Sequence, residues 1–527
     1  MEILKKQIDE LLKEWQSNNS PGFAISIIND NSKPDLYYYG CASLEHSILI
    51  DQDTVFYLCS LSKQFTATCL AFLIRDYKIS LSDPLRKYFP ELPANVYNPV
   101  TISHLVHMTS GIHEWYDMME YSGSYANEYP WRKSIIPLLT RQQKLSFTPG
   151  DRFLYCNTNY SLLTLIIEKI TSISLAEFAR KMIFEPLNLN TTFFCEDNNK
   201  VIFHLATGFY QVANINKAAD KLPPLIGAGG VYSNLKDMTI WLQAIISKNW
   251  QPEIFDILFT AEQLNDGTPN QYLMGFQNRL FHDQLIITHG GAVPGFFTHI
   301  SYLPQQNSGF VWLANHSNFK PNLFTDALLC YLEGEFKPNS GSDQTHSVQL
   351  PNPSRYSGNY HYIDEKLLLT LEANGNSFII NNSSDEYIQK QKNIFVNKGD
   401  NSKFIVMQEY HQLIILRIIT ENEDRFLLKT SELPRIKDYK QFCGSYFSPE
   451  LDVIYSLTNC QDKLYIDAVK RFSGTDLKPI AQDIFISPVK GSKIRFQRND
   501  KQEITSFYLD SFRSQNFIFH KIPGTNS

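Results

Sequence analysis

The first two thirds of the chain alternate between hydrophobic patterns typical of strands and patterns typical of helices. Runs rich in β-branched and aromatic residues predict paired strands at 22–28 and 36–40, joined by a polar turn. Apolar residues at helical spacing then predict helices, before strand patterns return ahead of residue 335. Because strands lie at both ends with helices between them, we expect one sheet in which N- and C-terminal segments are neighbours. The expected helices are 63–76, 103–108, 159–171 and 235–247, and the later strands are 285–288, 297–303 and 310–314.

The pattern changes after residue 335. A polar stretch with Pro, Gly and Ser at 336–349 predicts a linker between a mixed α/β domain at 1–335 and a β-rich remainder. Nearly every later apolar run is short and strand-like, and Asn374-Gly375 is a hairpin signal. Tyr356-Ser-Gly-Asn-Tyr360 recurs as Phe442-Cys-Gly-Ser-Tyr446, each before a series of strands. We therefore expect two related β modules, at 350–432 and 433–527, although a coincidence between two strand starts would give the same pattern.

Composition narrows the class of protein. The formal charge of -6 over 527 residues, without a basic tract, argues against nucleic-acid binding. Eight scattered cysteines without a CxxC pair argue against a disulfide framework and favour a reducing compartment. Leu4, Ile8, Leu11 and Trp15 form the apolar stripe of an expected amphipathic helix rather than a signal peptide. No apolar run is long enough to span a bilayer, so we expect a cytoplasmic protein unless a non-standard route exports it.

The first candidate for chemistry is Ser60-Leu-Ser-Lys63 at the start of an apolar helix. Residues at i and i+3 share a helix face, so the lysine amine can reach the serine hydroxyl. The amine can act as a base only where burial or a neighbouring cation keeps it partly neutral. The pattern alone is weak, because Ser487-Pro-Val-Lys490 also matches it.

The second candidate is Tyr155-Cys-Asn157, which we expect at a corner between a strand and a helix. A phenol near a lysine can lose its proton more easily and act as a base, and the Asn amide can orient a lysine or a carbonyl. Tyr125-Ala-Asn127 also satisfies this pattern, and an isolated Tyr155 would most simply be a half-buried aromatic residue.

The third candidate is His289-Gly290-Gly291, expected directly after a strand. Glycines there let the backbone approach a ligand closely and leave an amide free to donate. Acyl transfer needs such donors where the carbonyl oxygen becomes anionic. Taken alone, the motif is more typical of a tight turn.

As an ordered set, Ser60-x-x-Lys63, Tyr155-x-Asn157 and His289-x-Gly291 resemble the signature elements of the serine β-lactamase and penicillin-binding-protein-like hydrolases. The likeness is greatest to the branch with class C β-lactamases, D-aminopeptidases, DD-carboxypeptidases and related esterases, and it covers about residues 10–330. It implies an α/β (α+β) fold, with an antiparallel sheet flanked by helices and a helical subdomain. The remainder resembles the barrel domains of some D-aminopeptidase-like members.

The resemblance also implies roles for individual residues. Ser60 would form an acyl-enzyme while Lys63 and Tyr155 exchange its proton, and the N–H groups of Ser60 and Ala292 would form an oxyanion hole. No metal or cofactor is implied. The substrate would be a small molecule or a peptide with D-residues, an amide or an ester. The residues expected to hold it are Asn157, His289, Gly291 and Ala292.

One departure from the family pattern bears on specificity. Many β-lactamases carry a lysine where this chain has His289, and a lysine keeps the positive charge that holds a substrate carboxylate. Histidine is mostly neutral at pH 7. We therefore expect weak hydrolysis of carboxylate-bearing β-lactams and a preference for peptides with D-residues or simple esters.

Other functions remain as alternatives. The hydrolase fold could be a catalytically silent scaffold whose β modules recruit partners, and a homo-oligomer is compatible with the sequence. His104 and His107 lie one helical turn apart, but the glutamate of a zincin motif is missing. Gly227-Ala-Gly-Gly230 resembles a dinucleotide fingerprint, with Tyr232 in place of the third glycine.

Overall fold

The computed structural model forms two compact units, one of residues 1–120 and 124–339 and the other of residues 121–123 and 340–527. The predicted linker at 336–349 and most of the predicted N-terminal helix lie outside the described residues. Among the described residues, no helix is both long and apolar enough to cross a membrane. The structure describes residues 8–9, 12–13, 19–30, 32–124, 131–197, 199–212, 215–220, 225–281, 284–317, 319, 321–333, 355–362, 368–374, 377–380, 386–391, 394–397, 404–410, 413–419, 424–429, 436–468, 474–487, 492–511 and 513–525.

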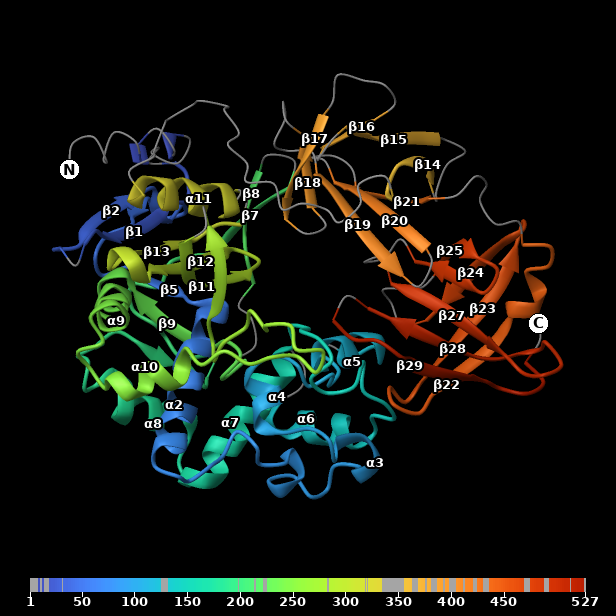
Figure 1. The fold of residues 1–527 in the computed structure, drawn as a ribbon, viewed down its shortest axis with the longest axis horizontal. Helices are drawn as coiled ribbons and strands as arrows, with labels where there is room; N and C mark the ends of the chain where they lie inside the picture. The colour runs from blue at the N-terminus through green and yellow to red at the C-terminus, as the bar shows by residue number, and fades with distance from the viewer. Residues whose placement is uncertain are drawn as a thin grey trace. The chain divides into compact units, whose positions relative to one another are not determined.

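The first unit is built on a six-stranded antiparallel sheet in the order β10-β11-β12-β13-β1-β2 (Figure 1). Strand β1 pairs with β13 from Phe23 opposite Ala314 to Ile28 opposite Gly309. The N- and C-terminal segments of the domain are therefore neighbours, which confirms the arrangement predicted from the sequence. The strands are β1 (Phe23–Ile28), β2 (Asp35–Tyr39), β10 (Gln277–Phe281), β11 (Gln284–Val293), β12 (Phe296–Leu303) and β13 (Ser308–Ala314).

Helices cover both faces of this sheet, which explains the uninterrupted apolar runs. All six residues of β1 are buried, as expected for a strand with packing on both sides. Helix α11 (Pro321–Leu332) joins the core on one face through Phe324 and Leu328. Helix α9 (Leu235–Ser247) packs on the other face, close to Gly309 of β13.

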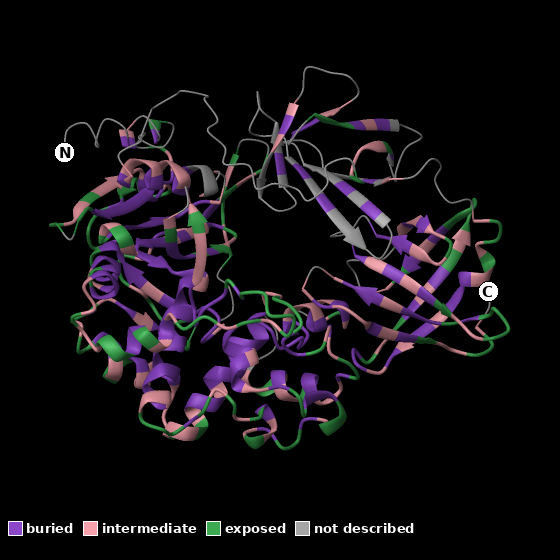
Figure 2. Ribbon diagram, in the orientation of Figure 1, coloured by how far each residue is buried: buried purple, intermediate pink, exposed green. Residues whose placement is uncertain are grey.

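A second layer of helices surrounds the segment that carries the first motif. Helix α2 (Ser62–Arg75) is buried along most of its length (Figure 2) and packs against α7 (Asn157–Thr171) and α10 (Pro252–Leu258). The other helices are α3 (Ala94–Tyr97), α4 (Ile102–Val106), α5 (Trp115–Tyr121), α6 (Trp131–Thr140) and α8 (Leu175–Ala179). The smaller sheets contain β3 (Cys41–Ser43) with β4 (Ile48–Leu49), β5 (Val55–Tyr57) with β9 (Val231–Asn234) and β6 (Phe193–Phe194), and β7 (Phe209–Val212) with β8 (Ile215–Ala218).

The second unit contains two closed eight-stranded barrels, β14–β21 and β22–β29. This confirms the mixed α/β fold with C-terminal all-β barrels, whereas the exact domain boundaries stay a prediction. The first barrel has β14 (Gly358–Tyr362), β15 (Leu368–Asn374), β16 (Ser377–Ile380), β17 (Glu386–Gln391), β18 (Ile394–Asn397), β19 (Phe404–Tyr410), β20 (Leu413–Ile419) and β21 (Asp424–Lys429). The second has β22 (Gly444–Ser448), β23 (Val453–Cys460), β24 (Lys463–Asp467), β25 (Thr475–Ala481), β26 (Ile484–Ile486), β27 (Lys493–Arg498), β28 (Ile504–Asp510) and β29 (Phe517–Lys521).

The repeated sequence motif occupies equivalent positions in the two barrels. Tyr360 in β14 donates its hydroxyl to the carbonyl of Tyr356 at 2.7 Å, and Tyr446 in β22 donates to Phe442 at 2.8 Å. The motif glycine before each tyrosine has a positive φ, 138° at residue 358 and 131° at residue 444. The same local geometry therefore begins each barrel.

Candidate active site

Ser60 lies in a short 3-10 turn (Cys59–Leu61) that leads directly into α2. Lys63 follows in the first turn of α2 and is fully buried. Its Nζ lies 3.3 Å from Ser60 Oγ. The turn and the helix thus place an amine next to the hydroxyl, at the i, i+3 spacing of the sequence.

Oxygen acceptors from the described part of the chain surround the amine of Lys63. Besides Ser60 Oγ, Nζ donates to Asn157 Oδ1 at 2.8 Å and to the carbonyl of Ala228 at 2.6 Å. An ammonium group has three N–H donors, so this set of acceptors fits protonated lysine. Nζ also lies 4.9 Å from the ring centroid of Tyr155 and 5.7 Å from that of Tyr160, which favours the same charge.

The carbonyl of Ala228 comes from the glycine-rich segment 227–230. A Cβ atom on Gly227 would lie 1.8 Å from Thr164 Oγ1, and one on Gly229 would lie 2.6 Å from Tyr57 Oη. The glycines are needed here because the backbone passes through a tightly packed space beside Lys63. This packing explains why the segment resembles a dinucleotide fingerprint.

The second motif lies at the N-terminus of α7, which begins at Asn157. The residues before it, 151–156, have no regular secondary structure, so the strand expected before Tyr155 is absent from this described segment. The expectation was wrong because packing of the preceding loop, rather than a sheet, fixes the entry to α7. The backbone N–H of Asn157 donates to Glu114 Oε2 at 2.7 Å. Glu114 is buried, and a carboxylate at this position complements the helix dipole.

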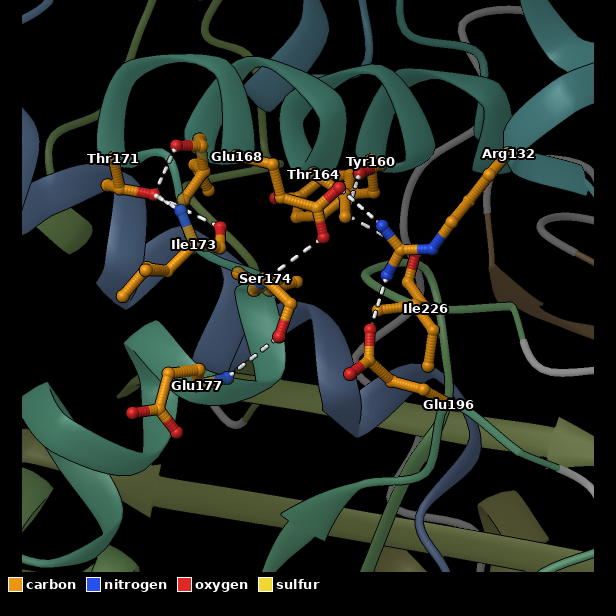
Figure 3. Close-up of polar contacts among 12 residues, drawn as sticks. Arg132, Tyr160, Thr164, Glu168, Thr171, Ile173, Ser174, Glu177, Glu196 and Ile226 are labelled. Carbon is orange, nitrogen blue, oxygen red and sulfur yellow. Dashed lines mark hydrogen bonds and ion pairs between the residues drawn. The ribbon is translucent and has the colours of Figure 1, made fainter.

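Polar contacts also hold the rest of α7 (Figure 3). Thr164 Oγ1 donates to the carbonyl of Tyr160 at 2.9 Å and contacts that of Ile226 at 3.3 Å, next to the glycine-rich segment. Farther along, Glu168 pairs with Arg132 and accepts from the backbone N–H of Leu175 at 3.0 Å. The helix that carries Asn157 and Tyr160 is therefore anchored at several points along its length.

The third motif lies inside a strand, not after one. His289, Gly290 and Gly291 belong to β11, and Gly291 pairs with Thr298 of β12. The predicted end of the strand was wrong because β12 continues to pair with β11 through both glycines. A Cβ atom on Gly291 would lie 2.7 Å from the Cβ of Cys59, so glycine allows the strand to approach the residue before Ser60.

The turn at Ser60 is held from this strand pair as well. Thr298 Oγ1 donates to the carbonyl of Leu58 at 2.9 Å. Cys59 has a φ of 54°, which is uncommon for a residue with a side chain. Such a conformation persists only where the surroundings determine it, as the packing of β11 and β12 does here.

His289 has both ring nitrogens engaged. Nδ1 lies 2.7 Å from the carbonyl of Gly290, which can only accept, so Nδ1 carries a proton and donates it. In the neutral ring Nε2 then accepts from the hydroxyl of Tyr272, at 3.0 Å. Burial, together with the charge of Lys63, lowers the pKa of His289 to about 3.

The structure thus gathers the residues expected from the sequence. Ser60, Lys63 and Asn157 are joined by hydrogen bonds, and the ring of Tyr155 lies over the lysine. Tyr155 also lies against His289, with ring centroids 6.4 Å apart. Ala292 is exposed on β11, one residue beyond Gly291. This arrangement places the Ser60 hydroxyl beside an amine that lies over a phenol ring, next to a strand with two glycines.

Sequence reasoning missed three contributors to this site. Glu114 and Tyr272 belong to no recognisable pattern, and the carbonyl of Ala228 is a backbone group whose only signal was the surrounding glycines. His104 and His107, considered as metal ligands, have other contacts. His104 takes part in the capping box of α4 with Thr101, and His107 Nδ1 donates to the carbonyl of Tyr272 at 3.0 Å.

The fold and the site together define a known class of protein. Its members have a sheet flanked by helices and a Ser-x-x-Lys turn at the start of a buried helix. The family model described as Beta-lactamase matches residues 4–329. The chain belongs to the β-lactamase family.

Individual proteins show how distant the relationships are. A D-aminopeptidase from Gluconobacter oxydans (strain 621H) is 23% identical over 325 residues, which are 62% of this chain and 61% of the relative. A β-lactamase from Escherichia coli (strain K12) is 25% identical over 362 residues, 61% of this chain and 90% of the relative. The chain thus spans about three fifths of the length of the D-aminopeptidase it matches.

A solved structure shares the fold over a larger part of the chain. The octameric penicillin-binding protein homologue from Pyrococcus abyssi has a TM-score of 0.54 and 22% sequence identity, covering 81% of this chain and 99% of its own. This similarity concerns the fold.

Proposed function

We propose that this protein is a serine hydrolase that acts through a covalent acyl-enzyme on an amide, ester or D-residue-containing peptide. The observation that carries the proposal is the 3.3 Å contact between Lys63 Nζ and Ser60 Oγ inside a buried network with Asn157. A serine needs a neighbouring group to take its proton, and Tyr155, whose ring centroid lies 4.9 Å from Lys63 Nζ, is the candidate for that role. The similarity to D-aminopeptidases supports the choice of substrate class.

In the proposed reaction, Ser60 Oγ attacks the substrate carbonyl carbon and its proton passes to the Tyr155–Lys63 pair. The positive charge of Lys63 near the ring of Tyr155 favours loss of the phenol proton, so Tyr155 is the better base. The same pair returns a proton to the leaving group, and Tyr155 then activates the water that releases the acyl group. Asn157 orients the lysine, and the N–H groups of Ser60 and Ala292 would stabilise the oxyanion.

Acylating probes provide the test. We expect a fluorophosphonate probe to label the protein and the label to disappear in Ser60→Ala. Ser487→Ala is the matched control, because Ser487 belongs to the other Ser-x-x-Lys pattern and lies in the unit that contains the barrels. Labelling that persists in Ser60→Ala, or no labelling by any acylating probe, would contradict the proposal and favour a silent scaffold.

A further inference from the structure

Tyr272 links the second and third motifs, although no sequence pattern singles it out. It is almost fully buried. Its hydroxyl lies 3.0 Å from His289 Nε2, and its ring meets that of Tyr155 edge to face, with centroids 6.0 Å apart. Phe153 stacks on the same ring at 5.7 Å. One side chain thus contacts both the proposed base and the third motif.

The backbone of Tyr272 is fixed as firmly as its side chain. Its N–H donates to Asn270 Oδ1 at 3.1 Å, and its carbonyl accepts from His107 Nδ1 at 3.0 Å. Asn270 in turn donates to the carbonyl of His107 at 2.9 Å. Because both partners are themselves buried, the hydroxyl of Tyr272 has a defined position toward His289.

The surroundings of His289 disfavour a second positive charge. Lys63 faces it from α2, Tyr155 from the segment before α7, Tyr272 from its loop and His299 from β12. The Lys63 ammonium repels an imidazolium, and neither the phenol of Tyr272 nor the second imidazole carries a negative charge at neutral pH. With Gly290 and Tyr272 occupying its nitrogens, the ring keeps neither an N–H nor a charge for a substrate.

We propose that Tyr272 is a specificity-determining residue of this hydrolase: its hydroxyl fixes the neutral His289 ring with Nε2 directed into the protein, so the site selects acyl donors without a carboxylate near the third motif. The inference rests on the proposed serine hydrolase function and adds a restriction on its substrates. Tyr272 acts through His289 and is thus a positioning residue.

Matched substrates test this selection. Two p-nitrophenyl esters are compared, one ending in a free carboxylate and the other in the methyl ester of that carboxylate. In Tyr272→Phe the ring and its packing remain, but His289 Nε2 loses its hydrogen-bond partner. A substrate carboxylate nearby then raises the pKa of the ring against the lowering by burial and Lys63, and Nε2 can take a proton. We expect the ratio of kcat/KM, carboxylate over methyl ester, to rise about tenfold, the equivalent of one charge-assisted hydrogen bond. The rise should grow as the pH falls, because it requires protonated His289.

Two further variants separate this effect from general damage. Tyr97→Phe removes another buried tyrosine hydroxyl, which donates to Gln142 Oε1 at 2.6 Å, and should leave the ratio unchanged. Combining Tyr272→Phe with His289→Asn removes the titrating ring and should abolish the rise. A ratio in Tyr272→Phe equal to that of the unaltered protein at every pH would overturn the proposal.

Nuclear magnetic resonance of ¹⁵N-labelled histidine tests the same inference without turnover. The His289 signal, assigned by its loss in His289→Asn, should show a neutral ring with the proton on Nδ1 from pH 8 to pH 5. Titration of His289 within that range in the unaltered protein would contradict the proposal. Failure of the proposed function looks different, since neither ester would then show turnover that depends on Ser60.

Discussion

At the scale of single residues, burial decides what the side chains of this protein can do. Lys63 is an ordinary lysine by sequence, but it is fully buried among oxygen acceptors and tyrosine rings. His289 is an ordinary histidine whose nitrogens are used inside the fold. Since water is excluded from both, their charges depend on neighbouring groups rather than on their usual pKa values.

Another buried histidine outside the site gives a prediction on stability. Burial lowers the pKa of His316 to about 3, and its ring packs edge to face on Phe23. The unfolded chain therefore binds a proton near pH 6.5 that the folded protein does not bind until about pH 3. Stability from this group is complete above pH 6.5 and is lost as the pH falls toward 3.

Between pH 7 and pH 5 this loss amounts to about 2 kcal/mol for one histidine. Over that interval, the free energy of unfolding of the unaltered protein should thus fall by about 2 kcal/mol more than that of His316→Gln. Urea unfolding followed by tryptophan fluorescence measures it, because all six tryptophans lie before residue 335. Equal pH slopes in the two proteins would show that His316 does not carry this effect.

At the scale of elements, the N-terminus of α7 connects the fold with the proposed chemistry. Glu114 accepts a hydrogen bond from the backbone N–H of Asn157, the first residue of the helix. The side chain of Asn157 in turn accepts one from Lys63. Thr158 extends the connection, since its hydroxyl donates to the carbonyl of His113 and accepts from the N–H of Trp115. A change at the start of this helix should therefore reach the lysine.

Glu114→Gln tests this connection. Loss of the charge at the helix N-terminus should lower the free energy of unfolding by about 1–2 kcal/mol and also lower kcat. Glu253→Gln is the matched control, since Glu253 lies in the first turn of α10 but is exposed, and should change stability by less than about 0.5 kcal/mol. Urea unfolding and ester hydrolysis measure the two effects. An unchanged kcat in Glu114→Gln would show that Glu114 does not influence the site.

The first strand of each barrel carries an equivalent tyrosine, so the two barrels should respond alike to its loss. Tyr360→Phe and Tyr446→Phe each remove a buried hydroxyl that donates four residues back along the chain. Each should weaken its own barrel by about 1 kcal/mol, seen as faster amide hydrogen exchange in that barrel. Tyr465→Phe, at a partly exposed position of β24, is the control. Faster exchange in only one barrel would argue against equivalent roles.

At the scale of the whole molecule, the residues of the proposed chemistry belong to one unit. Ser60, Lys63, Asn157, Ala228 and Tyr272 all lie in the unit of residues 1–120 and 124–339. The barrel strands contribute none of the hydrogen bonds described around Lys63. We therefore expect the first unit to assemble the proposed nucleophile and its proton-exchanging groups by itself.

A chain shortened after residue 335 should therefore still be labelled at Ser60 by a fluorophosphonate. Ser60→Ala in the same shortened chain is the control. Circular dichroism and tryptophan fluorescence establish whether the shortened protein is folded. A folded shortened chain that resists the probe would show that the barrels contribute to acylation.

The sequence by itself determined several of the elements and the order of the motifs. Local periodicity was enough for β1, β13 and α9, because side-chain burial on a strand or a helix repeats every few residues. The Ser60–Lys63 contact was likewise foreseeable, since one helical turn fixes it. The repeated aromatic-Gly-aromatic motif predicted two related β modules, because it is a local signal for the start of a strand.

Only the tertiary structure decided which distant groups meet. Lys63 contacts Asn157 and Ala228 across 94 and 165 residues of chain, and no local pattern encodes such separations. Tyr272 and Glu114 were invisible to sequence analysis because their roles come from the partner that packing brings to them, His289 and the N–H of Asn157. The extent of β11 through its glycines also depended on β12, since strand pairing is a property of two segments and not of one.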